Sequence, residues 1–481
     1  MKASIGIRVV ALVGLAALVA LWSLAVTATW SPARGQTLMP AIRLLITPEQ
    51  VKVGQEVVAT AQGLPPGRTL DLSWETVEGG WVVEEYYYFK GKKYVESTLP
   101  LGRFRVGADG RLNARFVIPE DWGGVHNVVA LEAGRPVAEG AVDVVQSFEL
   151  WPSSGPIGTP IELRVKGLGW RTMESTWVVN WDNSVAGFVS AAGTRGSATA
   201  RFRATGPIGP HMVKVYTGYM GQAYLNHEQA PNAYLPRPDF TFYTTPGEAP
   251  PTMYAEPYAL QPLPASVPPP GGWFGISPTQ GTVGSQATLR GAGFPAGEPL
   301  ILAWQTMVGS RVSGNGFAPE ETILGRVLAD DRGGLLAAVT VPEDLGGRHA
   351  LIVRQGDVEL ARTYFAIETS IVGMSPAAGP AGTVVSIHLK GVGWTEYDNI
   401  YTATYDNNYM GYACGFNSQG DVVINFTASG APGVHVIDLY PGIYQGPPAG
   451  QQLYRIPQLT YADDHPGNII PALRFAFTIT E

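Results

Sequence analysis

The 481-residue sequence has little cysteine, little charge and almost no clustering of basic residues. Its one cysteine, Cys414, excludes an internal disulfide and a zinc site of the Cys₄ or Cys₂His₂ type. The apolar and aromatic YMGYACGF setting predicts that Cys414 is a small buried residue rather than a reactive thiol. Charged residues make up 15% of the chain, the net charge is −8, and the one basic group is Lys90, Lys92 and Lys93. This balance argues against a nucleic-acid partner.

The sequence also has none of the short motifs that mark common catalytic sites. It contains no P-loop, no HExxH zinc motif and no nucleophile elbow. The glycine-rich string GAGFPAG is not followed by a helical pattern, which a dinucleotide site would require. Adjacent carboxylates such as Glu84 and Glu85 do not establish a glycosidase pair, because such a pair depends on spatial separation. We therefore expect a non-enzymatic protein with no catalytic residue, no cofactor and no metal.

One long hydrophobic run is present, from Val9 to Trp30, and it follows Lys2 and Arg8. The run is long enough for a membrane helix, while Val26-Thr27-Ala28 resembles a signal-peptidase site. Residues 1–30 are therefore either an uncleaved anchor or a cleaved signal peptide, and residues 31–41 form a tether. In both cases the rest of the chain is extracytoplasmic, anchored to the membrane or secreted.

Glycine (59 residues) and proline (39 residues) are abundant, and hydrophobic residues make up 45% of the chain. Turn formers mixed with Val, Thr, Tyr and Trp are typical of β proteins. One pattern occurs four times: a proline precedes a glycine by six positions, and a strand of alternating apolar and polar residues follows. The four pairs are Pro48 and Gly54, Pro152 and Gly158, Pro278 and Gly284, and Pro376 and Gly382. They predict four β domains in a chain of this length.

Matching residues recur at offsets of 223 to 230 positions, as for Trp74 and Trp304, which predicts a duplicated pair of unlike domains, A and B. The predicted order is A-B-linker-A-B: A1 at 42–147, B1 at 148–245, a Pro-rich linker at 246–272, A2 at 273–369 and B2 at 370–481. The composition of the linker predicts a semi-rigid polyproline II spacer with few contacts, so that each half folds alone.

The third repeat carries the pattern most fully. It reads SP-x-x-G-x-x-G, an alternating strand, GxGF-x-x-G from Gly291 to Gly297, and VP-x-x-x-GGxH from Val341 to His349. This pattern resembles the TIG/IPT immunoglobulin-like domain and related bacterial surface repeats. The second and fourth repeats carry Trp where that family usually has Phe, and the first is the most divergent. The resemblance implies an all-β fold of four tandem immunoglobulin-like β-sandwiches, preceded by one N-terminal hydrophobic helix.

Two recurring polar features fall at fixed repeat positions. Four histidines lie just after a turn and before an apolar strand, which predicts a scaffold role: His126, His211, His349 and His435. Asp182-Asn183 and Asp406-Asn407 lie between two strands and predict hairpin turns. The functional alternative for both pairs is a Ca²⁺ or sugar-hydroxyl contact through their oxygens.

The long loops of the B domains, 218–239 and 441–472, are the leading candidates for ligand contact. Their tyrosines and amide neighbours suit sugar rings or protein partners, and the alternative is that the loops pack on a neighbouring domain. The candidate contacts are Tyr219, Tyr224, Tyr234, Tyr444, Tyr454 and Tyr461, together with Asp182, Asn183, Asp406 and Asn407. A further candidate is the insert 82–97 of A1, which predicts a hairpin around Lys90-Gly91.

These features together predict an exported, membrane-tethered, non-enzymatic protein of the cell surface. Its expected partner is a cell-surface or extracellular glycan or protein, and the N-terminal segment supplies the membrane contact. Two other functions stay open. The first is a spacer or assembly component of the cell envelope without a ligand of its own. The second is an accessory subunit that presents substrate to a separate enzyme.

Overall fold

The computed structural model describes residues 42–84, 88–219, 222–258, 262–310, 316–415, 418–443, 456–467 and 470–481. Regular structure in these ranges is almost entirely β-strand, with η1 (His227–Gln229) as a short 3-10 turn, so the all-β prediction is confirmed. The predicted N-terminal helix lies outside the described residues. Across the described ranges, no helix has the length and apolar character needed to cross a membrane.

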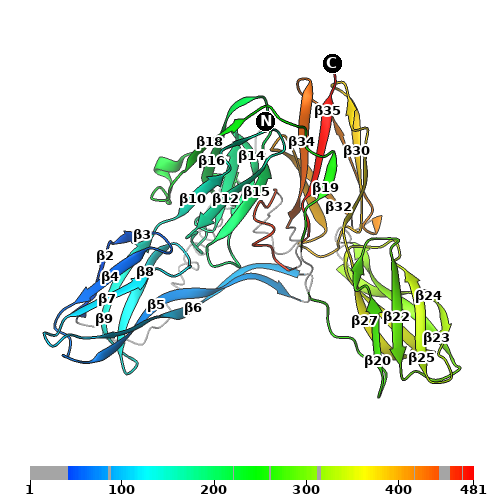
Figure 1. Ribbon diagram of the computed structural model, residues 1–481, viewed down its shortest axis with the longest axis horizontal. Coiled ribbons are helices and arrows are strands. Elements are labelled where there is room, and N and C mark those ends of the chain that lie inside the picture. Colours follow the sequence, from blue (N-terminus) through cyan, green and yellow to red (C-terminus); the bar gives the residue numbers. More distant parts are fainter. Residues whose placement is uncertain are drawn as a thin grey trace, which may run out of the picture. The chain divides into compact units, whose positions relative to one another are not determined.

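The strands form four pairs of sheets, one in each predicted domain (Figure 1). In A1 the smaller sheet has the order β2 (Leu45–Thr47), β4 (Glu56–Ala61), β7 (Leu112–Val117). The larger sheet of A1 has the order β1 (Ile42–Arg43), β9 (Arg135–Val144), β8 (Gly124–Glu132), β5 (Thr69–Glu84), β6 (Tyr88–Arg105), with β3 (Gln50–Val51) also on β9. In B1 the smaller sheet is β10 (Ser147–Trp151), β12 (Pro160–Lys166), β15 (Ala198–Arg203). The larger sheet of B1 is β11 (Ser154–Gly155), β18 (Asp239–Thr244), β16 (Gly209–Tyr219), β13 (Thr176–Trp181), β14 (Ser184–Ser190), with β17 (Gln222–Ala223) on β16.

The second half repeats this order of strands. In A2 the smaller sheet is β20 (Trp273–Ser277), β22 (Gln286–Ala292), β25 (Gly334–Thr340). The larger sheet of A2 is β21 (Gln280–Gly281), β27 (Val358–Ile367), β26 (Gly347–Gln355), β23 (Pro299–Ser310), β24 (Gly316–Leu328). In B2 the smaller sheet is β28 (Ser370–Ser375), β30 (Val384–Lys390), β33 (Val422–Thr427). The larger sheet of B2 is β19 (Met253–Ala255), β35 (Leu473–Ile479), β34 (Gly433–Gly442), β31 (Ile400–Tyr405), β32 (Asn408–Cys414), with β29 (Ala378–Gly379) also on β35.

Each pair of sheets encloses one apolar core, to which both sheets contribute. Strand β12 illustrates the cause: Ile161, Leu163 and Val165 are buried, while Glu162 and Arg164 point outward. Burial of one such branched side chain contributes roughly 1.5–3 kcal/mol. A smaller antiparallel sheet facing a larger one in this strand order is the arrangement of an immunoglobulin-like sandwich.

The recurring proline and glycine mark the point where the first strand of each domain changes sheet. In B1, β10 pairs within the smaller sheet, and β11 then runs parallel to β18 in the larger one. A cis peptide bond precedes each of the four prolines at this change. The four glycines have φ between +80° and +91°, a left-handed conformation that side chains with a Cβ disfavour: Gly54, Gly158, Gly284 and Gly382. The spacing of proline and glycine therefore marks the place where the backbone crosses from the smaller sheet to the larger one.

The recurring histidines are part of the scaffold, as predicted. Each ring stacks on an aromatic ring of the core, at centroid distances of 4.4, 5.0, 4.7 and 5.4 Å for the pairs Trp74–His126, Trp181–His211, Trp304–His349 and Tyr405–His435. In each case Nε2 lies within hydrogen-bond distance of the carbonyl oxygen four residues earlier. Both ring nitrogens of each histidine are thus engaged within its own domain.

The Pro-rich segment differs from its prediction. Its residues Met253–Ala255 form β19, which pairs antiparallel with β35 of B2 (Figure 1). Farther along, Val267 exchanges backbone hydrogen bonds with Arg362 of A2. The reason is that the edge strand β35 presents unpaired backbone groups, and the proline-free run Met253–Ala255 has the N–H groups to pair with them. The prediction of a spacer with few contacts is therefore wrong. The expectation that each half folds alone was argued from those few contacts, so it no longer has support.

Two further local predictions are wrong. In the hairpin β5–β6, Glu84 pairs with Tyr88, so the strands meet there and not at Lys90-Gly91. Lys90 is instead the extra residue of a bulge between the pairs Val82–Gly91 and Val83–Phe89, and Gly91 beside it has φ of +93°. Cys414 is exposed, because it lies on the outer side of the edge strand β32 rather than in a core.

Candidate functional site

The described part of the long B2 loop, residues 456–467, packs on B1. Phe188 N–H donates to the carbonyl of Pro457 (2.8 Å), and Leu459 N–H donates back to Phe188 (2.9 Å). On the other side Arg201 N–H donates to the carbonyl of Leu459 (2.8 Å). The segment therefore runs between β14 and β15, the edge strands of the two B1 sheets, and Leu459 is fully buried in the B1 core. Covering two free edges in this way protects them from other strands.

Side chains of the same loop reinforce this contact. Asp463 accepts from the backbone N–H of Thr199 (2.7 Å) and from Arg201 (2.9 Å). Asp464 accepts from the backbone N–H groups of Ala192 (2.8 Å) and Gly193 (2.6 Å). Burial raises the pKa of Asp464, and these hydrogen bonds act in the opposite direction.

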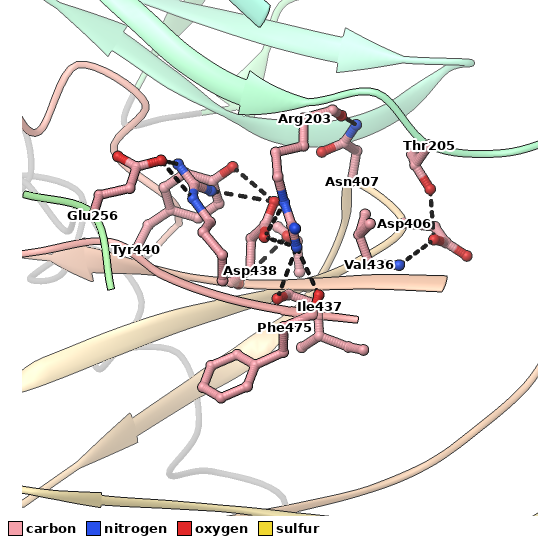
Figure 2. A network of polar contacts seen from close by, with 12 residues as sticks. Arg203, Thr205, Glu256, Asp406, Asn407, Val436, Ile437, Asp438, Tyr440 and Phe475 are labelled. Carbon is pink, nitrogen blue, oxygen red and sulfur yellow. Dashed lines mark hydrogen bonds and ion pairs between the residues drawn. The ribbon is translucent and has the colours of Figure 1, made fainter. Parts of the chain in front are cut away.

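A network of buried charges also joins B1 and B2 (Figure 2). Arg203 from β15 of B1 donates through Nε to Asp438 on β34 of B2 (2.9 Å), and its Nη2 donates to the carbonyl of Phe475 (2.6 Å). The second carboxylate oxygen of Asp438 lies 3.2 Å from Nη1 of Arg474. Arg474 also binds Glu256, which follows β19, at 2.8 Å from Nε to Oε1. Two guanidinium groups are thus balanced by two carboxylates, and the side chains of both arginines and Asp438 are at most 1% exposed.

Both Asp-Asn pairs form the predicted hairpin turns. All four residues have φ between +47° and +69°, as the tight turn requires. Asp406 and Asn407 contact B1 rather than solvent: Thr205 Oγ1 donates to Asp406 (2.5 Å), and the amide of Asn407 donates to the Arg203 carbonyl (2.8 Å). Asp182 and Asn183, the matching turn of B1, are exposed.

The His435–Asp406 pair stabilises the fold in acid rather than in base. The hydrogen bond to Asp406 raises the pKa of His435 above its ordinary value of 6.5. Since the pKa is higher in the folded state, the stabilisation is complete below about pH 6.5 and is lost as the pH rises through the raised pKa. We expect the difference in melting temperature between the natural chain and H435Q to be largest at about pH 5–6 and to shrink toward about pH 9. A difference that does not change with pH would contradict this assignment.

The candidate tyrosines have different environments. Tyr461 is buried, at 2% exposure, and its hydroxyl binds Glu256 and Arg474, which corresponds to the packing alternative. Tyr234 is 69% exposed, and partial burial of its hydroxyl together with the hydrogen bond to Glu174 raises its pKa to about 12. Tyr224 is half-buried. Tyr444, Tyr454 and the side chain of Tyr219 lie outside the described residues.

The A1 hairpin β5–β6 contacts both B domains, which the sequence did not predict. Trp81 Nε1 donates to Asp464 (2.9 Å), and the backbone N–H of Phe89 donates to Glu396 of B2 (2.7 Å). Phe89 is fully buried in a small apolar cluster with Phe188 of B1 and Ile443 of B2. The available signal was the number of aromatic residues in and beside the insert 82–97, among them Trp81 and Phe89.

A groove of 560 Å³ lies beside this contact. Its walls are formed by residues of A1, B1 and B2: Glu78, Gly79, Gly80, Trp81, Val82, Lys93, Val95, Gly193, His465, Pro466 and Gly467. Burial lowers the pKa of His465 to about 4, so its ring is neutral at pH 7. The charges at the groove are therefore those of the exposed Lys93 and of Glu78, which lies 3.9 Å from Arg195. An indole beside a few polar groups can bind a sugar ring or a peptide segment.

Among the described residues, no group of three or more His, Cys, Asp or Glu side chains could hold a metal ion.

Comparisons with known proteins do not identify a family. No family model matches the sequence, and no curated protein matches it. Among solved structures, the bacterial integrin-binding protein invasin aligns over 91% of this chain and 79% of its own, at 10% identity and a TM-score of 0.19. An ICAM-5 D1–D4 fragment aligns over 84% and 95%, at 13% identity and a TM-score of 0.18. A Salmonella alpha-2-macroglobulin aligns over 89% of this chain but 30% of its own, at 10% identity and a TM-score of 0.18. Scores this low carry no argument about fold or function.

Proposed function

We propose that the chain is an exported, membrane-tethered and non-enzymatic protein that binds a glycan or a protein at the cell surface. The observation that supports this proposal is the groove beside Trp81, whose walls come from A1, B1 and B2. Ligand sites occur preferentially at such domain interfaces. The hydrogen bonds of Trp81 and Phe89 to B2 fix the A1 wall before a ligand binds, which lowers the entropic cost of binding.

The finer features of the proposal rest on the sequence. The apolar run Val9–Trp30 after Lys2 and Arg8 is the proposed export signal and membrane tether. The spacing of Pro278, Gly284 and the GAGFPAG string supports TIG/IPT-type modules. The recurrence of residues at matching offsets supports an A-B-linker-A-B duplication with the limits given above.

The test is a binding screen of the full chain in detergent or lipid vesicles against cell-wall polymers, soluble glycans and surface proteins. Lys93→Ala removes an exposed charge from the groove and should weaken binding of the ligand by about tenfold or more, equal to about 1.4 kcal/mol. Lys52→Ala, which removes another exposed charge from a different part of A1, is the matched control and should leave binding unchanged. Equal affinity of the two variants for every ligand found would exclude the groove as the site.

A second candidate function, a spacer or assembly component, is supported by the buried network of Arg203, Asp438 and Arg474. A network of this kind fixes the geometry of two domains without leaving a surface for a ligand. If no probe in the same screen bound saturably while the contact between B1 and B2 stayed intact, the spacer function would be favoured over ligand binding.

A further inference from the structure

The arm of A1, which is the part of hairpin β5–β6 within residues 78–95, has two faces with different surroundings. Trp81 pairs with Lys92 across the hairpin, so their side chains lie on the same face. Lys92 donates to Ser175 of B1 (2.8 Å), and Trp81 donates to Asp464 of B2 (2.9 Å). This inner face is therefore occupied by contacts with the neighbouring domains.

The outer face of the arm forms part of the groove. Two cross-strand pairs lie on it, Glu78 with Val95 and Gly80 with Lys93, and all four residues line the groove. Glu78 and Lys93 are exposed, and Val95 is 55% exposed. A Cβ atom at Gly80 would lie 2.9 Å from the carbonyl oxygen of Ala192, so B1 bounds the outer face at this point.

Lys93 carries the unpaired charge of the groove. In the described part of the chain, no carboxylate oxygen lies within 4 Å of its ammonium group. Glu78 lies 3.9 Å from Arg195, which is also 3.3 Å from Asp121. Glu78 and Lys93 occupy diagonal positions of the hairpin, which are about 7–8 Å apart. A ligand that reaches the ammonium group of Lys93 therefore also comes close to the carboxylate of Glu78.

A cation and a hydrogen-bond acceptor on one exposed face fit an acidic sugar. A uronic acid has a carboxylate and several hydroxyl groups on one ring, so it can bind the ammonium group of Lys93 while a hydroxyl donates to Glu78. The C–H groups of the ring can pack against Val95 and the indole of Trp81. A protein partner would need a buried pocket for an anchoring side chain, and Val95 is too exposed to provide one.

We propose that the groove binds a polysaccharide that contains uronic acids, with the carboxylate of one ring held by Lys93. This inference rests on the proposed function, because it names the ligand class of the same groove. The chain as a whole has a net charge of −8 and repels acidic polymers, so the attraction is local to Lys93. Binding weakens as the salt concentration rises, because exposed charges are screened.

The test measures the binding of three probes of equal length to the full chain in lipid vesicles. The probes are hexamannuronate, the neutral hexasaccharide maltohexaose, and hexaglutamate. Maltohexaose shares the rings and hydroxyl groups of hexamannuronate, while hexaglutamate shares its charge. We expect hexamannuronate to bind at least about tenfold more tightly than either of the other two, because only it supplies both kinds of contact.

Variants of Lys93 assign this preference to the groove. Lys93→Glu should abolish the preference for hexamannuronate over maltohexaose, while Lys93→Arg, which keeps the charge, should retain it. Lys52→Glu reverses an exposed charge in another part of A1 and should also retain it. Thermal unfolding checks that each variant is folded.

Three results would overturn the proposal. They are equal affinity for hexamannuronate and maltohexaose, an unchanged preference in K93E, and tighter binding of hexaglutamate, which would indicate a protein partner. The proposed function fails on a different result, namely that Lys93→Ala weakens the binding of no ligand in the wider screen. A neutral glycan or a protein whose binding K93A weakens would keep the proposed function and exclude only the uronic acid.

Discussion

Replacing Asp438 by asparagine is expected to weaken the contact between B1 and B2 by about 3–5 kcal/mol. The side chain of Asp438 is fully buried between Arg203 and Arg474. Asparagine keeps the size of the side chain but leaves two buried guanidinium groups with a single carboxylate, Glu256. The free energy lost by removing the two guanidinium groups from water is then no longer compensated by ion pairing. Hydrogen exchange of the amides of Phe188, Arg201 and Leu459, which cross the interface, measures the loss directly.

Asp71→Asn is the matched control for this prediction. It makes the same chemical change in the ion pair Asp71–Arg103, which has a distance of 2.6 Å but side chains that are 46% and 78% exposed. An exposed pair of this kind contributes about 0–1 kcal/mol. If D438N and D71N had the same small effect on exchange at the interface and on thermal unfolding, the network would not hold the two domains together.

Replacing Tyr461 by alanine is expected to cost about 3–5 kcal/mol, by analogy with other buried aromatic residues. Its ring packs against Tyr440 at a centroid distance of 5.9 Å, and its hydroxyl donates to Glu256. The substitution therefore leaves a cavity and removes one partner of the charge network. Thermal unfolding should show a melting temperature lowered by several degrees.

Two comparisons separate the causes of this effect. Tyr461→Phe keeps the ring and should cost about 1–3 kcal/mol, the penalty for unsatisfied polar groups. Tyr243→Ala removes a ring that is 54% exposed on β18 and should change stability by about 0.5 kcal/mol or less. A melting temperature of Y461A close to that of Y243A would show that Tyr461 is a surface residue, as the ligand-contact alternative requires.

The sequence predicted most of what depends on local backbone chemistry. The proline-to-glycine spacing marked the change of sheet in all four domains, because a left-handed turn there requires glycine. The alternation in β12 identified its buried face, and the Asp-Asn pairs identified two tight turns. These features are set by neighbours within a few residues, so they can be read along the chain.

The contacts between domains could not be read in this way. Arg203 has the pattern of an outward-facing charge on a half-exposed strand, yet it is buried against Asp438, 235 positions away. Tyr461 and Asp406 had the residue types of ligand contacts, and Met253–Ala255 had the composition of a spacer. Their environments were decided by the surface that each one meets in the tertiary structure. The sequence by itself determined an all-β fold and the recurring turns at which the first strands change sheet. Only the tertiary structure decided which polar residues bind a neighbouring domain, because a buried charge needs a partner that no local pattern specifies.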